Sequence, residues 1–155
     1  MFSSPVAVDV LVVEDDADDL ELTLRALRRH DGTLAIRAVR DGAEALEILF
    51  GSAGRDPASS LPHMVLLDLH LPHMSGLDIL RRMRADSATR SIPVVILTAS
   101  QEGTDMQECF EAGANGYIVK PGIFEHLVEA IAAIGRLWME SAASPDAAPN
   151  TSDGD

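Results

Sequence analysis

The 155-residue chain is strongly acidic, with 25 Asp and Glu against 12 Lys and Arg and a formal net charge of −13 at pH 7. This charge argues against binding to nucleic acid or to an anionic membrane surface, and no apolar run approaches the ~20 residues that span a bilayer. With 46% hydrophobic residues, the chain can bury the core of one folded domain.

The chain ends and the cysteine content favour a cytoplasmic protein. The first five residues carry no positive charge and no long apolar stretch, so they do not form a signal peptide. The single cysteine, Cys109, cannot form an internal disulfide, and we expect it to fill space in the core.

Strand-like and helix-like segments alternate five times, which predicts an α/β fold with a parallel sheet and helices on both faces. The first strand is expected at residues 8–13, followed by a helix with leucines at helical spacing that closes at Asp31 and Gly32. The second strand is expected at residues 34–39 and leads into a short helix. Residues 51–62 are rich in Gly, Ser, Ala and Pro, and we expect a surface insertion there.

The second half of the chain continues the pattern. The remaining strands are expected at residues 64–67, 94–97 and 116–119, and the remaining helices at residues 76–85, 104–112 and 124–140. Ser75 is the expected N-cap of the first of these helices. Trp138 extends the inward stripe of the last helix, either as packing or as a dimer contact. We expect one domain over residues 1–140, a flexible tail over residues 141–155 and no output domain.

Chemically active side chains follow four of the five predicted strands. Glu14 and Asp15 follow the first strand, Asp68 the third, Thr98 the fourth and Lys120 the fifth. In an open parallel sheet, ligands bind beyond the carboxyl ends of the strands, so the predicted topology brings these groups into one crevice. Clustered carboxylates need a cation, and Mg²⁺ is the metal that such oxygen ligands suit. A metal and an ammonium beside a carboxylate favour phosphoryl transfer, with Asp68 as the nucleophile.

Four motifs in this order resemble the receiver domain of two-component response regulators. They are Val12-Val13-Glu14-Asp15-Asp16, Leu66-Leu67-Asp68 with Pro72 and Gly76, Leu97-Thr98-Ala99, and the run from Ala112 to Pro121 that contains Gly113, Tyr117 and Lys120. The resemblance covers residues 8–140. It implies a doubly wound, flavodoxin-like sheet of five parallel strands in the order 2-1-3-4-5.

The resemblance also implies a metal site. Asp15 and Asp68 would bind Mg²⁺ through their side chains and His70 through its backbone carbonyl, while Glu14 would hold a metal-bound water. Glu14 stands where many members have Asp, which is a common variant that leaves this role intact.

By the same resemblance, Asp68 would be the phospho-acceptor, and Thr98 and Lys120 would contact the phosphoryl oxygens. The Lys120-Pro121 bond is expected to be cis. On phosphorylation Thr98 would move towards the phosphate and Tyr117 would turn inward, which would remodel the surface around the fourth helix and fifth strand.

The partner that the resemblance implies is a sensor histidine kinase or a histidine phosphotransfer protein. The insertion at residues 51–62, Phe124 and the segments 89–93 and 98–100 are similar to the regulators paired with bacterial phytochrome kinases, so a bacteriophytochrome is one expected donor. We expect a phospho-switch that associates with itself or with a partner and is not an enzyme beyond its own phosphorylation and dephosphorylation.

Other interpretations of these residues are weaker. A haloacid-dehalogenase-type phosphatase also forms an aspartyl phosphate, but it needs a second Asp where this chain has His70. A flavin-binding electron carrier would need a phosphate-binding loop after the first strand, where this chain is acidic. His70 and His73 have the spacing of a zinc pair but lack matching co-ligands. Asp16 is expected to be a helix-terminal charge.

Overall fold

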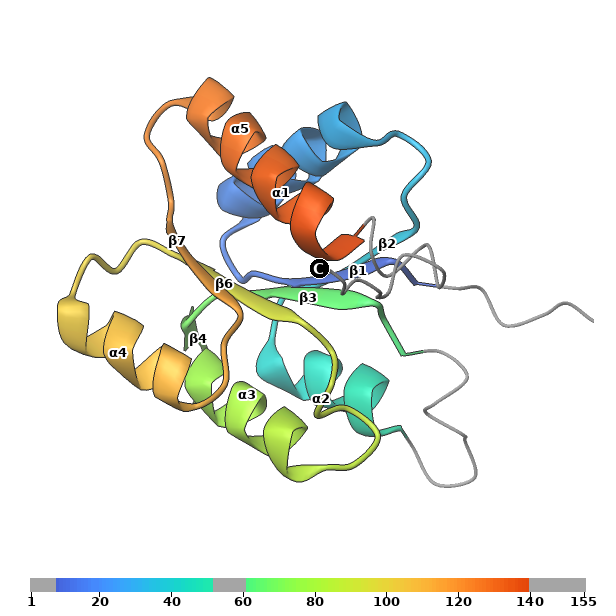
Figure 1. Cartoon of the computed structure of the whole chain (residues 1–155), viewed down its shortest axis with the longest axis vertical. Coiled ribbons are helices and arrows are strands. Elements are labelled where there is room, and N and C mark those ends of the chain that lie inside the picture. Colours follow the sequence, from blue (N-terminus) through green and yellow to red (C-terminus); the bar gives the residue numbers. More distant parts are fainter. Residues whose placement is uncertain (1–7, 52–60, 140–155) are drawn as a thin grey trace, which may run out of the picture.

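A computed structural model of the chain describes residues 8–51 and 61–139. Most of the expected insertion at residues 51–62 and the whole of the expected tail at residues 141–155 lie outside this range. Figure 1 shows a central sheet between two layers of helices.

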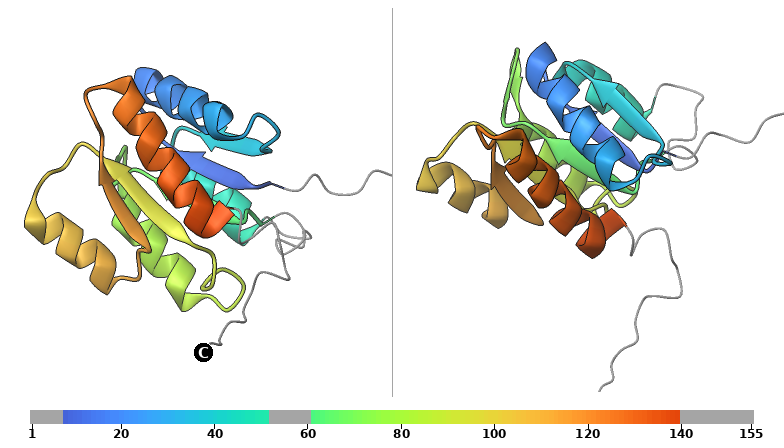
Figure 2. Two further views of the ribbon diagram at one scale, coloured as in Figure 1. Left: turned by 45° about the horizontal axis from the view of Figure 1, so that its top comes forward. Right: turned by 90° about the horizontal axis from the view of Figure 1, so that it is seen from above.

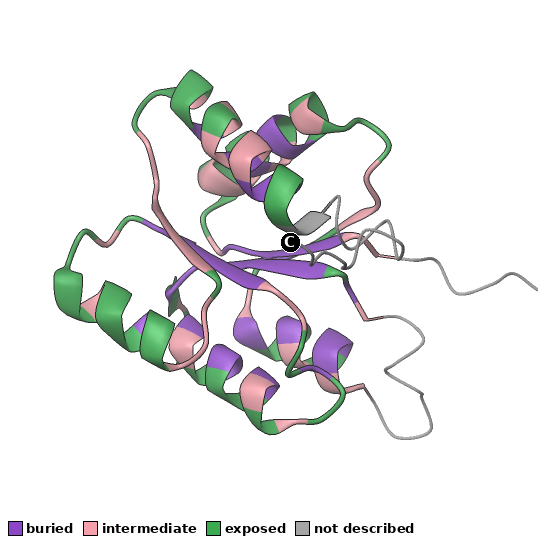
Figure 3. Ribbon diagram, viewed as in Figure 1, coloured by how far each residue is buried: buried purple, intermediate pink, exposed green. Residues whose placement is uncertain are grey.

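The sheet has five parallel strands in the order β2-β1-β3-β6-β7, which is the order 2-1-3-4-5 expected for the five core strands. Their bounds are β1 Val10–Val13, β2 Ile36–Val39, β3 Met64–Leu67, β6 Val94–Thr98 and β7 Gly116–Val119. The three central strands are buried along their whole length (Figure 3), because helices cover both faces of the sheet.

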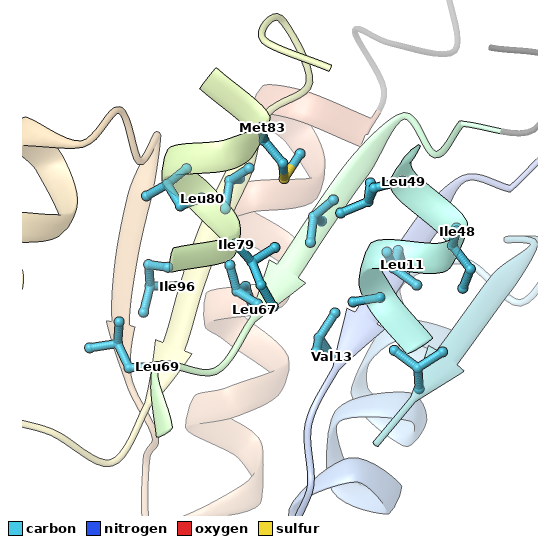
Figure 4. Close-up of a cluster of buried hydrophobic side chains, with 14 of the residues drawn as sticks. Leu11, Val13, Ile48, Leu49, Leu67, Leu69, Ile79, Leu80, Met83 and Ile96 are labelled. Carbon is cyan, nitrogen blue, oxygen red and sulfur yellow. The ribbon is translucent and has the colours of Figure 1, made fainter. Parts of the chain in front are cut away.

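Alternate residues of each central strand point into two different cores. Leu11 and Val13 of β1 pack with the helices on one face of the sheet, whereas Val10 and Val12 pack with the helices on the other. Figure 4 shows the first core, where Leu67 and Ile96 from the sheet meet side chains of the helices.

The helices divide between the two faces in the same way. Figures 1 and 2 show α1 and α5 side by side on one face, and α2, α3 and α4 on the other. Their bounds are α1 Ala17–His30, α2 Gly42–Phe50, α3 Gly76–Ala85, α4 Gly103–Glu111 and α5 Phe124–Ile134. Cys109 is the buried residue of α4 and lies in the core, as expected. Ser75 caps α3 with a capping box.

Two elements differ from the sequence-based expectation. A short antiparallel hairpin, β4 (His70–Leu71) and β5 (Met74–Ser75), fills the segment between Asp68 and α3. The last helix is α-helical to Ile134 and continues as a π-helix, η2 (Gly135–Met139). Trp138 belongs to η2. Its expected packing or dimer contact concerns a side chain outside the described residues.

Candidate functional site

The expected site residues stand directly beyond the carboxyl ends of the parallel strands. Hydrogen bonds that prolong the sheet fix their backbones: Glu14 N–H donates to Val39 O (3.1 Å), Asp68 N–H to Val13 O (3.0 Å) and Lys120 N–H to Thr98 O (2.7 Å). The sheet therefore places these residues side by side, although 52 residues separate Asp68 from Lys120.

Three carboxylates form a group that could hold a metal ion. One oxygen from each of Glu14, Asp15 and Asp68 lies within 4.8 Å of the others, and the side chains of Glu14 and Asp68 are buried. Lys120 alone does not balance their charge, and unbalanced buried charge is costly. Oxygen donors of this kind fit Mg²⁺, so the residues present suit the metal that the sequence implies.

Lys120 contacts three carboxylates at once. Its Nζ lies 2.6 Å from Glu14 Oε1, 2.9 Å from Asp19 Oδ2 and 3.1 Å from Asp68 Oδ2. Burial lowers the pKa of Lys120, but the hydrogen bonds to Glu14 and Asp19 and the charge of Asp68 outweigh it, so the pKa lies above its usual value. The ammonium is therefore a permanent cation beside Asp68.

Glu14 is the most perturbed acid of the site. Burial, together with the charge of Asp68, raises the pKa of Glu14 to about 7, against the hydrogen bonds that it accepts from Lys120 and from the Asp16 N–H. A cation bound nearby would favour the Glu14 anion and so oppose this rise of its pKa.

The loop after β3 contacts the second oxygen of the Asp68 carboxylate, the one that Lys120 does not contact. The His70 N–H donates to Asp68 Oδ1 at 3.3 Å, while the imidazole of His70 is exposed. Gly76 lies against the Asp68 backbone: a Cβ there would collide with the Asp68 carbonyl oxygen and stand 3.0 Å from its carbon. His73 occupies a left-handed position, φ 68°, in the turn of the β4–β5 hairpin.

Thr98 is buried at the end of β6, and its Oγ1 accepts a hydrogen bond from the Ser100 N–H at 3.4 Å. No hydrogen bond within the described ranges joins the Thr98 hydroxyl to Asp68 or Lys120. Ser100 also connects the next two elements: its Oγ donates to Asp105 Oδ2 in α4 (2.6 Å), and its carbonyl accepts from Tyr117 Oη in β7 (3.1 Å). Tyr117 is half-buried.

The expected cis bond between Lys120 and Pro121 is wrong for this structure, in which that peptide is trans. The trans form of an X-Pro bond is favoured by about 0.5–1 kcal/mol. With the trans bond, Lys120 already makes its three carboxylate contacts.

Two contributors to the site were not expected from the sequence. Asp19, in the first turn of α1, contacts Lys120 across 101 positions of the sequence. Arg40, after β2, donates two hydrogen bonds to the Asp15 carbonyl, at 3.2 and 2.8 Å. Both side chains look like ordinary surface charges in the sequence. Asp16 caps α1 by accepting from the Asp19 N–H, in line with its expected role as a helix-terminal charge.

The alternative zinc site at His70 and His73 gains no co-ligands from the fold. Within residues 8–51 and 61–139, Glu14, Asp15 and Asp68 are the sole group of three or more potential ligands.

No described helix is long and apolar enough to cross a bilayer.

Comparisons with known proteins agree with the geometry. The sequence profile of the response regulator receiver domain matches residues 10–132. The chain is 37% identical to a probable methanogenesis regulatory protein, FilR2 of Methanothrix harundinacea, over 88% of this chain and 86% of that protein. It is 30% identical to the response regulator Rcp1 of Synechocystis, over 94% and 97% respectively.

Solved structures show the same likeness. A bacteriophytochrome response regulator, RtBRR, is 44% identical with a TM-score of 0.69, covering 84% of this chain and 79% of that one. The phosphorylated cyanobacterial phytochrome response regulator RcpA is 29% identical with a TM-score of 0.76, covering 88% and 96%. The Mn²⁺-bound form of Rcp1 is 28% identical with a TM-score of 0.71, covering 88% and 96%.

The profile match spans most of the chain, the sheet has the expected strand order, and an acidic group and a lysine meet at its carboxyl edge. The haloacid-dehalogenase and flavin-carrier alternatives are set aside by this match. The chain is a member of the response regulator receiver domain family, and it is a signalling phospho-acceptor rather than a catalytic enzyme.

Proposed function

We propose that this chain accepts a phosphoryl group on Asp68 from a phosphohistidine of a sensor histidine kinase or histidine phosphotransfer protein. One observation supports this most directly: the Asp68 carboxylate lies 3.1 Å from the Lys120 ammonium and belongs to the group of three carboxylates that could hold a metal ion. An Asp68 oxygen forms the new P–O bond as the P–N bond of the phosphohistidine breaks, and the electron pair stays on the imidazole nitrogen.

The roles of the other residues follow from their places. Asp15 and Asp68 side chains and the His70 carbonyl would hold Mg²⁺, with Glu14 on a metal-bound water; the metal would neutralise charge on the phosphoryl oxygens. Lys120 keeps its cation at Asp68 and would contact a phosphoryl oxygen. Thr98 stands at the end of the neighbouring strand and would turn its hydroxyl away from the Ser100 N–H and towards the phosphate.

We propose that Thr98 and Tyr117 carry the signal to the surface. Ser100 supports this, because it hydrogen-bonds both side chains and Asp105 of α4. The surface of α4 carries an exposed Phe110. A shift of the Thr98–Ser100 segment would change this surface, which we propose for binding a second copy or a partner.

RtBRR is a bacteriophytochrome response regulator and RcpA is a cyanobacterial phytochrome response regulator, so we propose a bacteriophytochrome kinase in the cytoplasm as the donor.

Labelling tests the acceptor. The protein incubated with acetyl phosphate and Mg²⁺ should gain one phosphoryl group on a phosphate-affinity gel, and chelation of Mg²⁺ should abolish the gain. Asp68→Asn should not be labelled, whereas Asp41→Asn, which loses the same charge and keeps the N-cap of α2, should be labelled like the wild type. Equal labelling of Asp68→Asn would overturn the assignment.

The donor is tested with a phosphorylated bacteriophytochrome kinase and an unrelated histidine kinase at equal concentrations. Faster transfer from the phytochrome supports the pathway, and the absence of any preference contradicts it. Light scattering before and after phosphorylation measures self-association; an unchanged molar mass and unchanged kinase affinity would contradict the switch.

A further inference from the structure

We infer that Asp19 is a positioning residue for the phosphoryl transfer, because it holds the Lys120 ammonium at Asp68. The inference rests on the proposed function of Asp68 and adds a residue outside the expected set. Its basis is the contact of 2.9 Å between Asp19 Oδ2 and Lys120 Nζ.

The three hydrogens of the Lys120 ammonium match its three carboxylate partners. Two of these partners, Glu14 and Asp68, belong to the group that could hold a metal, and Asp68 is also the proposed acceptor. Asp19 lies outside that group. It is therefore the partner whose contact with Lys120 does not compete with metal binding or with the new P–O bond.

Lys120 needs such a partner because its side chain is long and flexible. A lysine side chain loses up to about 2 kcal/mol of rotamer entropy when it is fixed in one geometry. The backbone of Asp19 is itself fixed, since its N–H donates to the Asp16 side chain at 2.9 Å in the cap of α1. The start of α1 thus provides a fixed partner for the side chain of Lys120, which directly follows β7.

Asp19 also brings a negative charge to the mouth of the site, where its side chain is 40% exposed. That charge opposes the approach of an anionic donor, so its removal has two effects of opposite sign on transfer. Two kinds of variant distinguish the loss of the Lys120 contact from the loss of the repelling charge. One removes both the charge of Asp19 and the oxygen that Lys120 contacts, and the other removes the charge alone.

Three variants make the separation. Asp19→Ala removes charge and acceptor, Asp19→Asn removes the charge and keeps an acceptor oxygen, and Asp18→Ala removes a neighbouring charge from the same turn. Asp18 is exposed and has no ion pair or hydrogen bond through its side chain in the part of the chain that the structure describes. It is therefore the matched electrostatic control.

The measurement is the rate of labelling by acetyl phosphate at saturating Mg²⁺, as a function of donor concentration. Asp19→Ala should lower the maximal rate about three- to tenfold, the loss expected for one half-exposed contact to a charged group. Asp19→Asn should recover most of that rate. Asp18→Ala should keep the maximal rate of the wild type, with an equal or slightly lower half-saturating donor concentration. Thermal unfolding identifies any variant that has lost its fold.

Two outcomes would overturn the inference: a maximal rate of Asp19→Ala equal to that of Asp18→Ala, or an equal loss in Asp19→Asn and Asp19→Ala. Failure of the proposed function looks different, because the wild type itself would then not be labelled.

Discussion

Gly76 shows how one missing side chain positions the backbone of Asp68. It begins α3, and its backbone N–H donates to Leu69 O at 2.8 Å, which closes the loop that follows Asp68. The atoms nearest to its absent Cβ are backbone atoms of Asp68 and Leu69, which cannot rotate away as a side chain could. Any larger residue must displace the backbone of Asp68.

Gly76→Ala should therefore lower the free energy of unfolding by about 1–3 kcal/mol, as overpacking does, and should reduce labelling of Asp68. Urea denaturation measures the first effect and acetyl phosphate labelling the second. Gly103→Ala is the matched control, because a Cβ at the start of α4 meets nothing within 4 Å. Its stability should equal or exceed that of the wild type. Equal stability of the two variants would show that the Asp68 loop yields freely.

At the scale of elements, Arg84 ties α3 to the amino ends of two strands. Its guanidinium donates to the Ile92 carbonyl at 2.9 Å and to the Gly113 carbonyl at 2.9 Å. It also donates to Asn115 Oδ1 at 3.0 Å. Gly113, at φ 108°, has no Cβ to obstruct it, and the same Asn115 oxygen accepts the Val94 N–H. This arrangement fixes the end of the sheet opposite to Asp68.

Arg84→Met should lower the free energy of unfolding by about 2–3 kcal/mol, because hydrogen bonds from a charged donor are lost and carbonyl groups are left without partners. Arg81→Met removes an exposed charge from the same helix and should change the free energy of unfolding by less than about 0.5 kcal/mol. Chemical denaturation of both variants checks this. Labelling of Asp68 should persist in Arg84→Met. If this variant loses less than about 0.5 kcal/mol of its free energy of unfolding, the structural role of Arg84 is contradicted.

At the scale of the whole molecule, we expect the acidic group at the carboxyl edge to make stability depend on a cation. The chain carries a net charge of −13, and three of its carboxylates converge within 4.8 Å. A ligand that binds the folded state alone stabilises it by about 2.7 kcal/mol at one hundred times its dissociation constant. We therefore expect metal binding and folding to be coupled in this protein.

Saturating Mg²⁺ should raise the thermal midpoint by about 5–10 °C, from the usual conversion for a chain of this size. Asp15→Asn should lose most of this rise. Asp16→Asn removes the same charge one residue later, keeps the N-cap of α1 and should retain it. Calorimetry with and without chelator gives the comparison, and an equal rise in Asp15→Asn and wild type would place the metal elsewhere.

The extent of agreement between sequence and structure follows from the range of each interaction. The apolar strands and their order in the chain identify the sheet edge, and this predicts that Glu14, Asp68 and Lys120 meet. Asp19 could not be predicted, because a first-turn aspartate is already explained by its own helix. Its contact with Lys120 depends on where α1 lies on the sheet. Arg40 and Arg84 bind backbone carbonyls, which leave no pattern in a sequence.

The burial of Cys109 gives the molecule a built-in reporter of α4 motion. This single thiol belongs to α4 and is fully buried in the core, and burial raises the pKa of the Cys109 thiol to about 11. Only the thiolate attacks an alkylating reagent, so the folded protein reacts when the helix lifts and water reaches the sulfur. The alkylation rate therefore counts openings of α4 without any added label, and it compares resting and phosphorylated protein on one time scale.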